Sequence, residues 1–222
     1  MRLRQHFDER LDEIRSDVLR MGGMACDMVR MAVDAAMNGE IELAGEVIRS
    51  DDEVDFLEDD TVNRAVLLVM QEAPVGRDLR FLAATLGIIG EIEKVADDAC
   101  KLARRSTKLQ GSFPAEMKSA LLEIGEQARQ AFASSLRLYA EYDDALATQI
   151  IKSDKEIDGQ YKAARNRLFE LIKKNPDATE HLVRTIEIFH ALEHVADHAV
   201  EIAGRLKLHY SETPPLPPQP VP

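Results

Sequence analysis

The chain has 222 residues, of which 45% are hydrophobic and 31% charged, and it carries a net charge of −12 at pH 7. This length can bury a hydrophobic core in one large domain or two small ones, and the acidic balance argues against nucleic-acid binding. A composition rich in Ala, Leu, Glu and Lys/Arg, without Trp, favours an all-helical protein.

The start of the chain and its cysteines indicate a cytoplasmic protein. The opening MRLRQHFDERLDEI lacks the apolar stretch and cleavage site of a signal peptide. No run approaches the roughly 18–20 apolar residues that span a bilayer. Cys26 and Cys100 cannot build a disulfide framework, and we expect them to be buried, reduced thiols.

Apolar residues recur at three- and four-residue spacing almost throughout, which predicts long helices and no strands. Gly, Pro, Asn and Asp interrupt this pattern at the junctions between helices. The helices are expected at 3–38, 40–72, 77–108, 115–141, 143–173 and 177–209. Their short connections make successive helices antiparallel neighbours.

Two pairs of similar segments indicate an internal duplication. IRSDDEVD at 48–55 returns as IKSDKEID at 151–158, and EIEKVADDACKLARR at 91–105 returns as ALEHVADHAVEIAGR at 191–205. The segments return after 103 and 100 residues, respectively (151 − 48 and 191 − 91). Two related halves explain this pattern better than chance.

The duplication divides the chain into four parts. The first repeat covers 1–109, a linker covers 110–114, and the second repeat covers 115–210, with three helices in each repeat. The remaining segment, 211–222, contains SETPPLPPQPVP and is expected to be extended or disordered. Its PxxP spacing fits a docking peptide, but we interpret it as a solvated tail.

Acidic pairs with four-residue spacing occur twice in each half. Such pairs usually form a solvated helix face, so the decisive question is which face they occupy. At about 100° per residue, Glu193 lies within about 20° of Ile186 and Val200, inside the apolar face of its helix. The other pairs are placed similarly, and together they form this set: Asp51, Asp55, Glu93, Asp97, Asp154, Asp158, Glu193 and Asp197.

A carboxylate among apolar neighbours loses solvation worth several kcal/mol unless a partner compensates. Lysines and arginines are too few on these faces to pair with every carboxylate, and the pattern therefore indicates a cation. Oxygen ligands suit iron(III), manganese, magnesium or calcium, with zinc also acceptable. Arg165 lies beside Asp158 in angle and could pair with it, weakening or replacing metal in the second half.

Three histidines follow one another at four-residue spacing on the last helix. His190 and His194 are close enough to the apolar face to contribute to a metal site, whereas His198 is interpreted as a surface residue. Their first-half counterparts are Gly90, Lys94 and Asp98, so both halves cannot share a histidine function.

The repeated motifs resemble the PhoU family of phosphate-uptake regulators. The similarity rests on GRDLRFLAATLGIIGEIEKVADDACKLA and ALEHVADHAVEIA, with RMGGM at 20–24, the SDDEVD and SDKEID segments, and the APVGRDLR entry to the third helix. It covers nearly the whole chain except the Pro-rich tail. Ala96 and Ala196 replace a glycine that is frequent in the family motif, and Arg80 has no second-half equivalent.

The resemblance implies two pseudo-symmetric three-helix bundles in a cytoplasmic protein. It further implies contacts with the ATPase subunit of a phosphate ABC transporter and with its sensor histidine kinase, repressing the phosphate-starvation response when phosphate is plentiful. Such a protein is peripheral to the membrane only through its partners, and dimerisation is common in the family. Members of the family look to bind multinuclear iron or zinc clusters through these acidic motifs. The resemblance therefore implies one cluster held by Asp51, Asp55, Glu93 and Asp97. It implies a second cluster held by Asp154, Asp158, Glu193 and Asp197.

The residues alone leave open two alternatives to a metal-binding regulator. A metal-free helical scaffold would leave its acidic faces in water between the bundles. A di-metal carboxylate enzyme would need Glu-x-x-His pairs on two helices, and the chain offers only the reversed His190-x-x-Glu193. Because no phosphate-cradling Gly-rich loop, Ser/His/Asp set or Cys nucleophile is recognisable, we expect a non-enzymatic protein.

Overall fold

A computed structural model describes residues 2–109 and 113–211 of the chain. Within these ranges the protein is all helical, with short 3-10 turns at Ala115–Met117 and Pro176–Ala178. The six long helices are α1 (Arg2–Asn38), α2 (Ile41–Glu72), α3 (Arg77–Ser106), α4 (Lys118–Ala140), α5 (Asp144–Lys174) and α6 (Thr179–Tyr210). The expected all-α class is confirmed. The expectations for 110–112 and for 212–222 lie outside the described residues.

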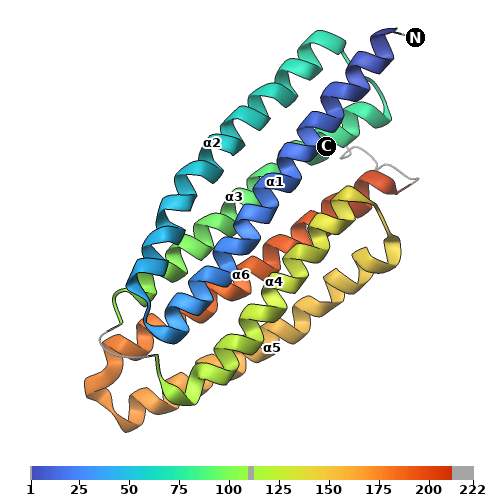
Figure 1. The fold of residues 1–222 in the computed structure, drawn as a ribbon. Helices are drawn as coiled ribbons and strands as arrows, with labels where there is room; N and C mark the ends of the chain where they lie inside the picture. Colours follow the sequence, from blue (N-terminus) through green and yellow to red (C-terminus); the bar gives the residue numbers. More distant parts are fainter. Residues whose placement is uncertain (1, 110–112, 212–222) are drawn as a thin grey trace, which may run out of the picture.

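The helices form two bundles of three that lie side by side (Figure 1). Helices α1, α2 and α3 pack together in the first half, and α4, α5 and α6 in the second. The halves meet where α3 packs on α6 and α1 packs on α4, while α2 and α5 lie at the two outer sides. None of the described helices contains a stretch apolar enough to cross a membrane.

Local sequence explains where the helices start and stop. At the end of α1, Gly39 adopts φ 73° and its N–H donates to the carbonyl of Ala35 at 2.9 Å. Glycine tolerates this left-handed conformation without steric cost, so the chain can reverse there. At the start of α5, the Asp143 carboxylate accepts hydrogen bonds from the N–H groups of Ala145 and Leu146. This side-chain cap replaces missing intrahelical partners.

The apolar faces of all six helices meet in one hydrophobic core. Each fully buried large side chain stabilises the fold by about 1.5–3 kcal/mol relative to an exposed one. Because the core is continuous, neither bundle buries its apolar face without the other. Fully buried members from both halves include Met21, Met28, Leu68, Leu82, Ile88, Phe113, Phe132 and Phe189.

The repeated glycines lie where α1 and α4 approach each other. A Cβ atom on Gly22 would lie 2.5 Å from Cδ2 of Leu136, and one on Gly125 would lie 2.9 Å from Cγ2 of Val33. The duplication relates Gly22 to Gly125 and Val33 to Leu136 by the same 103 residues (125 − 22 and 136 − 33). The same contact therefore occurs twice about a pseudo-twofold axis, and glycine permits the close approach at both places.

Candidate functional site

The second-half carboxylates gather between α5 and α6. Oxygen atoms of Asp154 and Asp158 on α5 and of Asp197 on α6 all lie within 4.8 Å of one another. The fourth predicted residue, Glu193, lies beside them, and its interaction with Asp158 contributes to a raised pKa. All four side chains are half-buried. The structure thus brings the predicted second-half set together.

Mutual repulsion and burial oppose ionisation in this group. Desolvation raises the pKa of Glu193, and the Asp197 charge raises it further, although His190 acts in the opposite direction. The pKa of Asp197 is also raised, first by desolvation and then by Asp154. Carboxylates in this state are stabilised by a nearby positive charge, so the donor set fits a bound cation.

The first-half carboxylates face one another between α2 and α3. Desolvation and the neighbouring charges of Glu58, Asp97, Asp55 and Asp51 raise the pKa of Glu93 to about 6. Glu58 was not among the predicted residues. It follows Asp51 by seven positions and therefore shares its helix face, a spacing that makes it recognisable in the sequence.

The first-half group is looser than its counterpart. Among the described residues, the groups of three potential metal ligands with atoms within 4.8 Å of one another both lie in the second half. The predicted apolar setting of Asp55 is wrong, because this side chain is exposed. Its neighbour in angle, Val66, is itself 42% exposed, so that side of α2 is only partly covered.

Basic side chains reach some of the predicted ligands. Lys162 Nζ lies 2.7 Å from Asp158, and Lys101 Nζ lies 3.3 Å from Asp97. Asp51 has a longer contact of 4.0 Å with Arg104. For the other predicted carboxylates, no lysine or arginine of the described ranges comes within 4.0 Å.

The cation beside Asp158 is not the expected one. The guanidinium of Arg165 lies 5.6 Å from the ring centroid of Tyr161, on the same helix. Lys162, four residues after Asp158, forms the ion pair instead. The i,i+4 spacing accounts for this choice, because it stacks the two side chains on one helix face.

Cys100 lies next to the first-half carboxylates. Burial and a hydrogen bond to Asp51 raise the pKa of the Cys100 thiol to about 12. The expected buried thiol is therefore confirmed for Cys100. Cys26 is half-buried, with its sulfur 3.9 Å from an Nη1 atom of Arg129.

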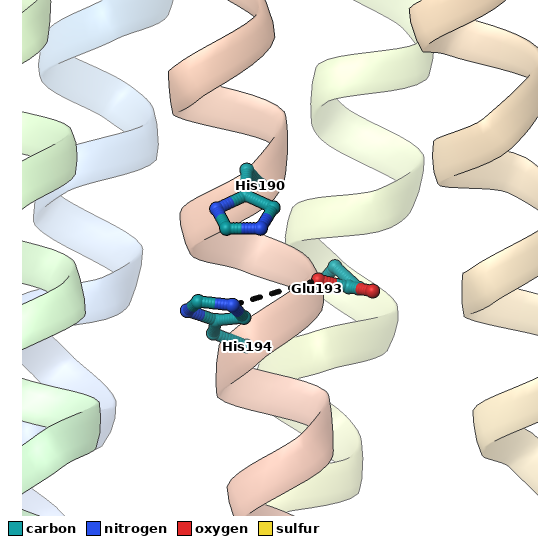
Figure 2. A group of neighbouring side chains, drawn as sticks. All are labelled: His190, Glu193 and His194. Atoms are coloured by element: carbon teal, nitrogen blue, oxygen red, sulfur yellow. Dashed lines mark ion pairs between the residues drawn. The ribbon is translucent and has the colours of Figure 1, made fainter.

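The structure places two of the histidines beside a predicted ligand, whereas the prediction for the third is wrong. His190 and His194 lie beside Glu193 on α6 (Figure 2). His198 was expected on the surface, but its side chain is only 18% exposed. Packing of α3 against α6 covers the helix face that carries it, and a projection of one helix does not reveal that second interface.

His198 links two buried carboxylates of the other half. Its Nδ1 lies 2.9 Å from Glu91 Oε2, and its Nε2 lies 3.4 Å from Asp98 Oδ2. The carboxylate side chains are 6% and 3% exposed, respectively. Burial alone would lower the pKa of His198, but the two carboxylates raise it above its usual value.

Three further cations surround these carboxylates. Arg205 lies 3.0 Å and Lys94 3.3 Å from Glu91, and Lys101 lies 2.9 Å from Asp98. Burial raises the pKa of both carboxylates, yet hydrogen bonds and charges from these partners and His198 bring it below the usual range. Because Arg205 and His198 belong to α6, this charged network joins the two halves.

The order of these contacts shows that α3 and α6 run antiparallel. Glu91 contacts Arg205, whereas Arg105, near the end of α3, forms a 2.9 Å ion pair with Glu187. Glu91 and Asp98 were missed in the sequence, although their seven-residue spacing places them on one face. What the sequence could not reveal is that this face meets the other half.

The two halves each match the family model described as "PhoU domain", at residues 18–106 and 121–206. The chain is 29% identical over 201 residues to a phosphate-specific transport system accessory protein PhoU homolog of Pseudomonas aeruginosa, covering 90% of this chain and 83% of the relative. A homolog of the same name from Xylella fastidiosa is 27% identical, with 96% and 90% covered.

Solved structures show the same fold. The crystal structure of PhoU from Pseudomonas aeruginosa aligns with a TM-score of 0.88 at 28% identity, covering 91% of this chain and 98% of that one. The phosphate transport system regulatory protein PhoU from Streptococcus pneumoniae has a TM-score of 0.86, with 93% and 98% covered; at 22% identity this likeness concerns the fold alone.

Proposed function

Because this chain belongs to the PhoU family, we propose that it is an accessory protein of phosphate transport that restrains phosphate uptake and the phosphate-starvation response. The observation that carries this proposal is the match of both halves to the family, together with 83–90% coverage of relatives named as accessory proteins of phosphate-specific transport. The regulator acts without catalysis of its own.

The partners we propose are proteins of the phosphate transport system. A regulator of this kind would act in the cytoplasm, contacting the ATPase subunit of the ABC transporter and the sensor histidine kinase. It would act as a homodimer and reach the membrane only through these partners. The relatives' description as accessory proteins of phosphate-specific transport supports an association with that system.

We further propose that the paired carboxylates bind metal ions. Asp154, Asp158 and Asp197 support this through their spacing, and Glu93 through its pKa of about 6. Iron or zinc is the favoured ion, with manganese and magnesium as further hard-ion candidates. A bound cation would offset the repulsion among these carboxylates, and the ligands would hold α2 against α3 and α5 against α6.

Deletion of the gene tests the regulatory role. In phosphate-rich medium, loss of a negative regulator should raise expression of phosphate-starvation genes, and the intact gene should restore repression. Unchanged expression of those genes in the deletion strain would contradict the proposal. Pull-down of the transporter ATPase subunit and of the sensor kinase with the full chain tests the proposed contacts separately.

Metal analysis tests the carboxylate proposal. The full chain, purified without a polyhistidine tag, should carry iron or zinc by elemental analysis, or gain thermal stability when either ion is added. Simultaneous Asp→Asn substitution of Asp154, Asp158 and Asp197 should reduce the metal content. If the protein holds no metal and no added ion changes its melting temperature, the metal-free scaffold is the correct description.

A further inference from the structure

His190, Glu193 and His194 form a second group of metal-ligating side chains, on α6 alone. One ligand atom from each lies within 4.8 Å of the other two. Figure 2 shows the two imidazole rings one above the other on the helix, with the Glu193 carboxylate beside them. The spacing produces this arrangement, because residues three and four positions apart share a helix face.

The distances allow the three side chains to share one ion. Zinc binds nitrogen and oxygen ligands at about 2.0–2.2 Å, which places tetrahedral ligands about 3.4 Å apart. The rings of His190 and His194 are 4.1 Å apart between centroids, and His194 Nε2 lies 3.9 Å from Glu193 Oε2. Because the three ligand atoms lie within 4.8 Å of one another, they need to approach by up to about 1.4 Å to reach this spacing.

A buried carboxylate also lies near His194. While Nε2 faces Glu193, Nδ1 lies 3.7 Å from Oδ2 of Asp98, whose side chain is only 3% exposed. At this distance the two atoms do not form a hydrogen bond, but the negative charge of Asp98 attracts a cation bound at the imidazole. On the other side, His190 is exposed, so solvent can reach the site and supply the remaining ligands.

The first half has no equivalent group. Gly90 and Lys94 occupy the positions that correspond to His190 and His194, and Lys94 is paired with Glu91. A site with two imidazoles and one carboxylate suits zinc, whereas sites with oxygen ligands alone suit harder ions. The duplicated halves therefore differ in the chemistry that they offer to a metal.

We propose that His190, Glu193 and His194 chelate one zinc-like divalent ion on the surface of α6. Glu193 is shared with the carboxylates of the proposed function, but zinc binding by this group does not require Asp154, Asp158 or Asp197. The His-x-x-Glu-His spacing also occurs in a class of zinc peptidases, where the two histidines bind the metal and the glutamate acts as a base. The proposal concerns binding of the ion, not hydrolysis.

The test uses the full chain without a polyhistidine tag and Zn²⁺ as the probe. Imidazole resonances in long-range ¹H–¹⁵N NMR spectra report each histidine separately. Substoichiometric Zn²⁺ should perturb His190 and His194 first. In calorimetric titrations, His190→Ala and His194→Ala should each weaken this binding event by at least about tenfold. His6→Ala removes an exposed histidine from α1 and is the matched control, with an expected change below about twofold.

A second variant separates this proposal from the carboxylate clusters. The triple variant Asp154→Asn, Asp158→Asn and Asp197→Asn removes the carboxylate group between α5 and α6 but leaves the three proposed ligands. Retained Zn²⁺ perturbation of His190 and His194 in that variant supports the proposal, even if the carboxylates bind no metal. The proposal is overturned if Zn²⁺ leaves both imidazoles unperturbed, or if His190→Ala and His194→Ala bind Zn²⁺ as tightly as the natural chain.

Discussion

His198 on α6 lies 2.9 Å from Glu91 on α3, and this contact joins the two halves of the duplicated chain. Both side chains are largely buried, and His198 also faces Asp98. Removing one member of such a network leaves the others desolvated with fewer partners. The contact is therefore a structural link between the halves, and its loss is measurable.

His198→Ala should destabilise the metal-free protein by about 2–3 kcal/mol. Lys94, Lys101 and Arg205 stay near the carboxylates, which keeps the expected cost below that of an uncompensated buried charge. Urea unfolding with a metal chelator present measures the difference. His6→Ala, an exposed control, should change the free energy of unfolding by less than about 0.5 kcal/mol.

The stabilising effect of His198 should depend on pH. The folded protein raises the pKa of this histidine above 6.5, so its charged form stabilises the fold fully below that pH. The contribution is lost as the pH rises through the folded-state pKa. The gap in unfolding free energy between the natural chain and His198→Ala should therefore be larger at about pH 6 than at about pH 9. An equal gap at both pH values would contradict this assignment.

Gly22→Ala should destabilise the protein, although alanine is the better helix former. The added methyl group would lie 2.5 Å from Leu136 Cδ2, and the repacking should cost about 1–3 kcal/mol. The higher helix propensity of alanine offsets up to about 1 kcal/mol of this cost. Gly23→Ala is the matched control, because its Cβ meets nothing within 4 Å and should stabilise the protein by about 0.5–1 kcal/mol. Thermal unfolding of both variants separates the two effects.

Glu93→Gln should stabilise the metal-free protein at neutral pH by about 1 kcal/mol, allowing for solvent screening. Its pKa of about 6, raised by burial and by Glu58, means that ionisation at neutral pH opposes folding. As the pH falls from about 6 towards 4.5, Glu93 takes up a proton in the folded state and the advantage of Gln should disappear. Urea unfolding across this range measures the trend. A Gln variant less stable at neutral pH would show that Glu93 stabilises the metal-free fold.

Cys100 should resist alkylation in the folded protein. Burial and Asp51 raise the pKa of its thiol to about 12, so almost no reactive thiolate is present at about pH 8. Mass spectrometry after iodoacetamide treatment should find Cys100 modified only once the chain is unfolded in urea. Rapid modification of Cys100 under native conditions would contradict its assigned environment.

The helices were readable from the sequence because their apolar period is long and uninterrupted. The expected ends 38 and 72 agree with α1 and α2, while α3 ends at Ser106 rather than at 108. The carboxylate pairs were also recognisable, since a duplication displays them twice. Side-chain partners were not: whether Lys162 or Arg165 pairs with Asp158 depends on rotamers and local packing.

The burial of polar side chains between the two halves could not be predicted from the sequence. The sequence pattern of a single helix reveals only its most apolar face, and His198 lies away from that face on α6. It is covered because α3 supplies Glu91 and Asp98 from the other half. Such polar interfaces leave no hydrophobic pattern, so sequence periodicity alone does not reveal them.

The reciprocal contacts of Gly22 and Gly125 have the form of a symmetric dimer interface within one polypeptide. The α3–α6 contact, however, has diverged from that symmetry: Glu91 and Asp98 correspond to Ala191 and His198. If two copies of the first half paired in this manner, Glu91 of each would face Asp98 of the other in place of His198, while Arg105 would take the position of Arg205 beside it. The pairing of the two different halves thus places a histidine where the self-associated first half would place a second carboxylate, which favours the observed pairing at this contact. After the duplication, divergence has therefore placed complementary groups on the two sides of this contact.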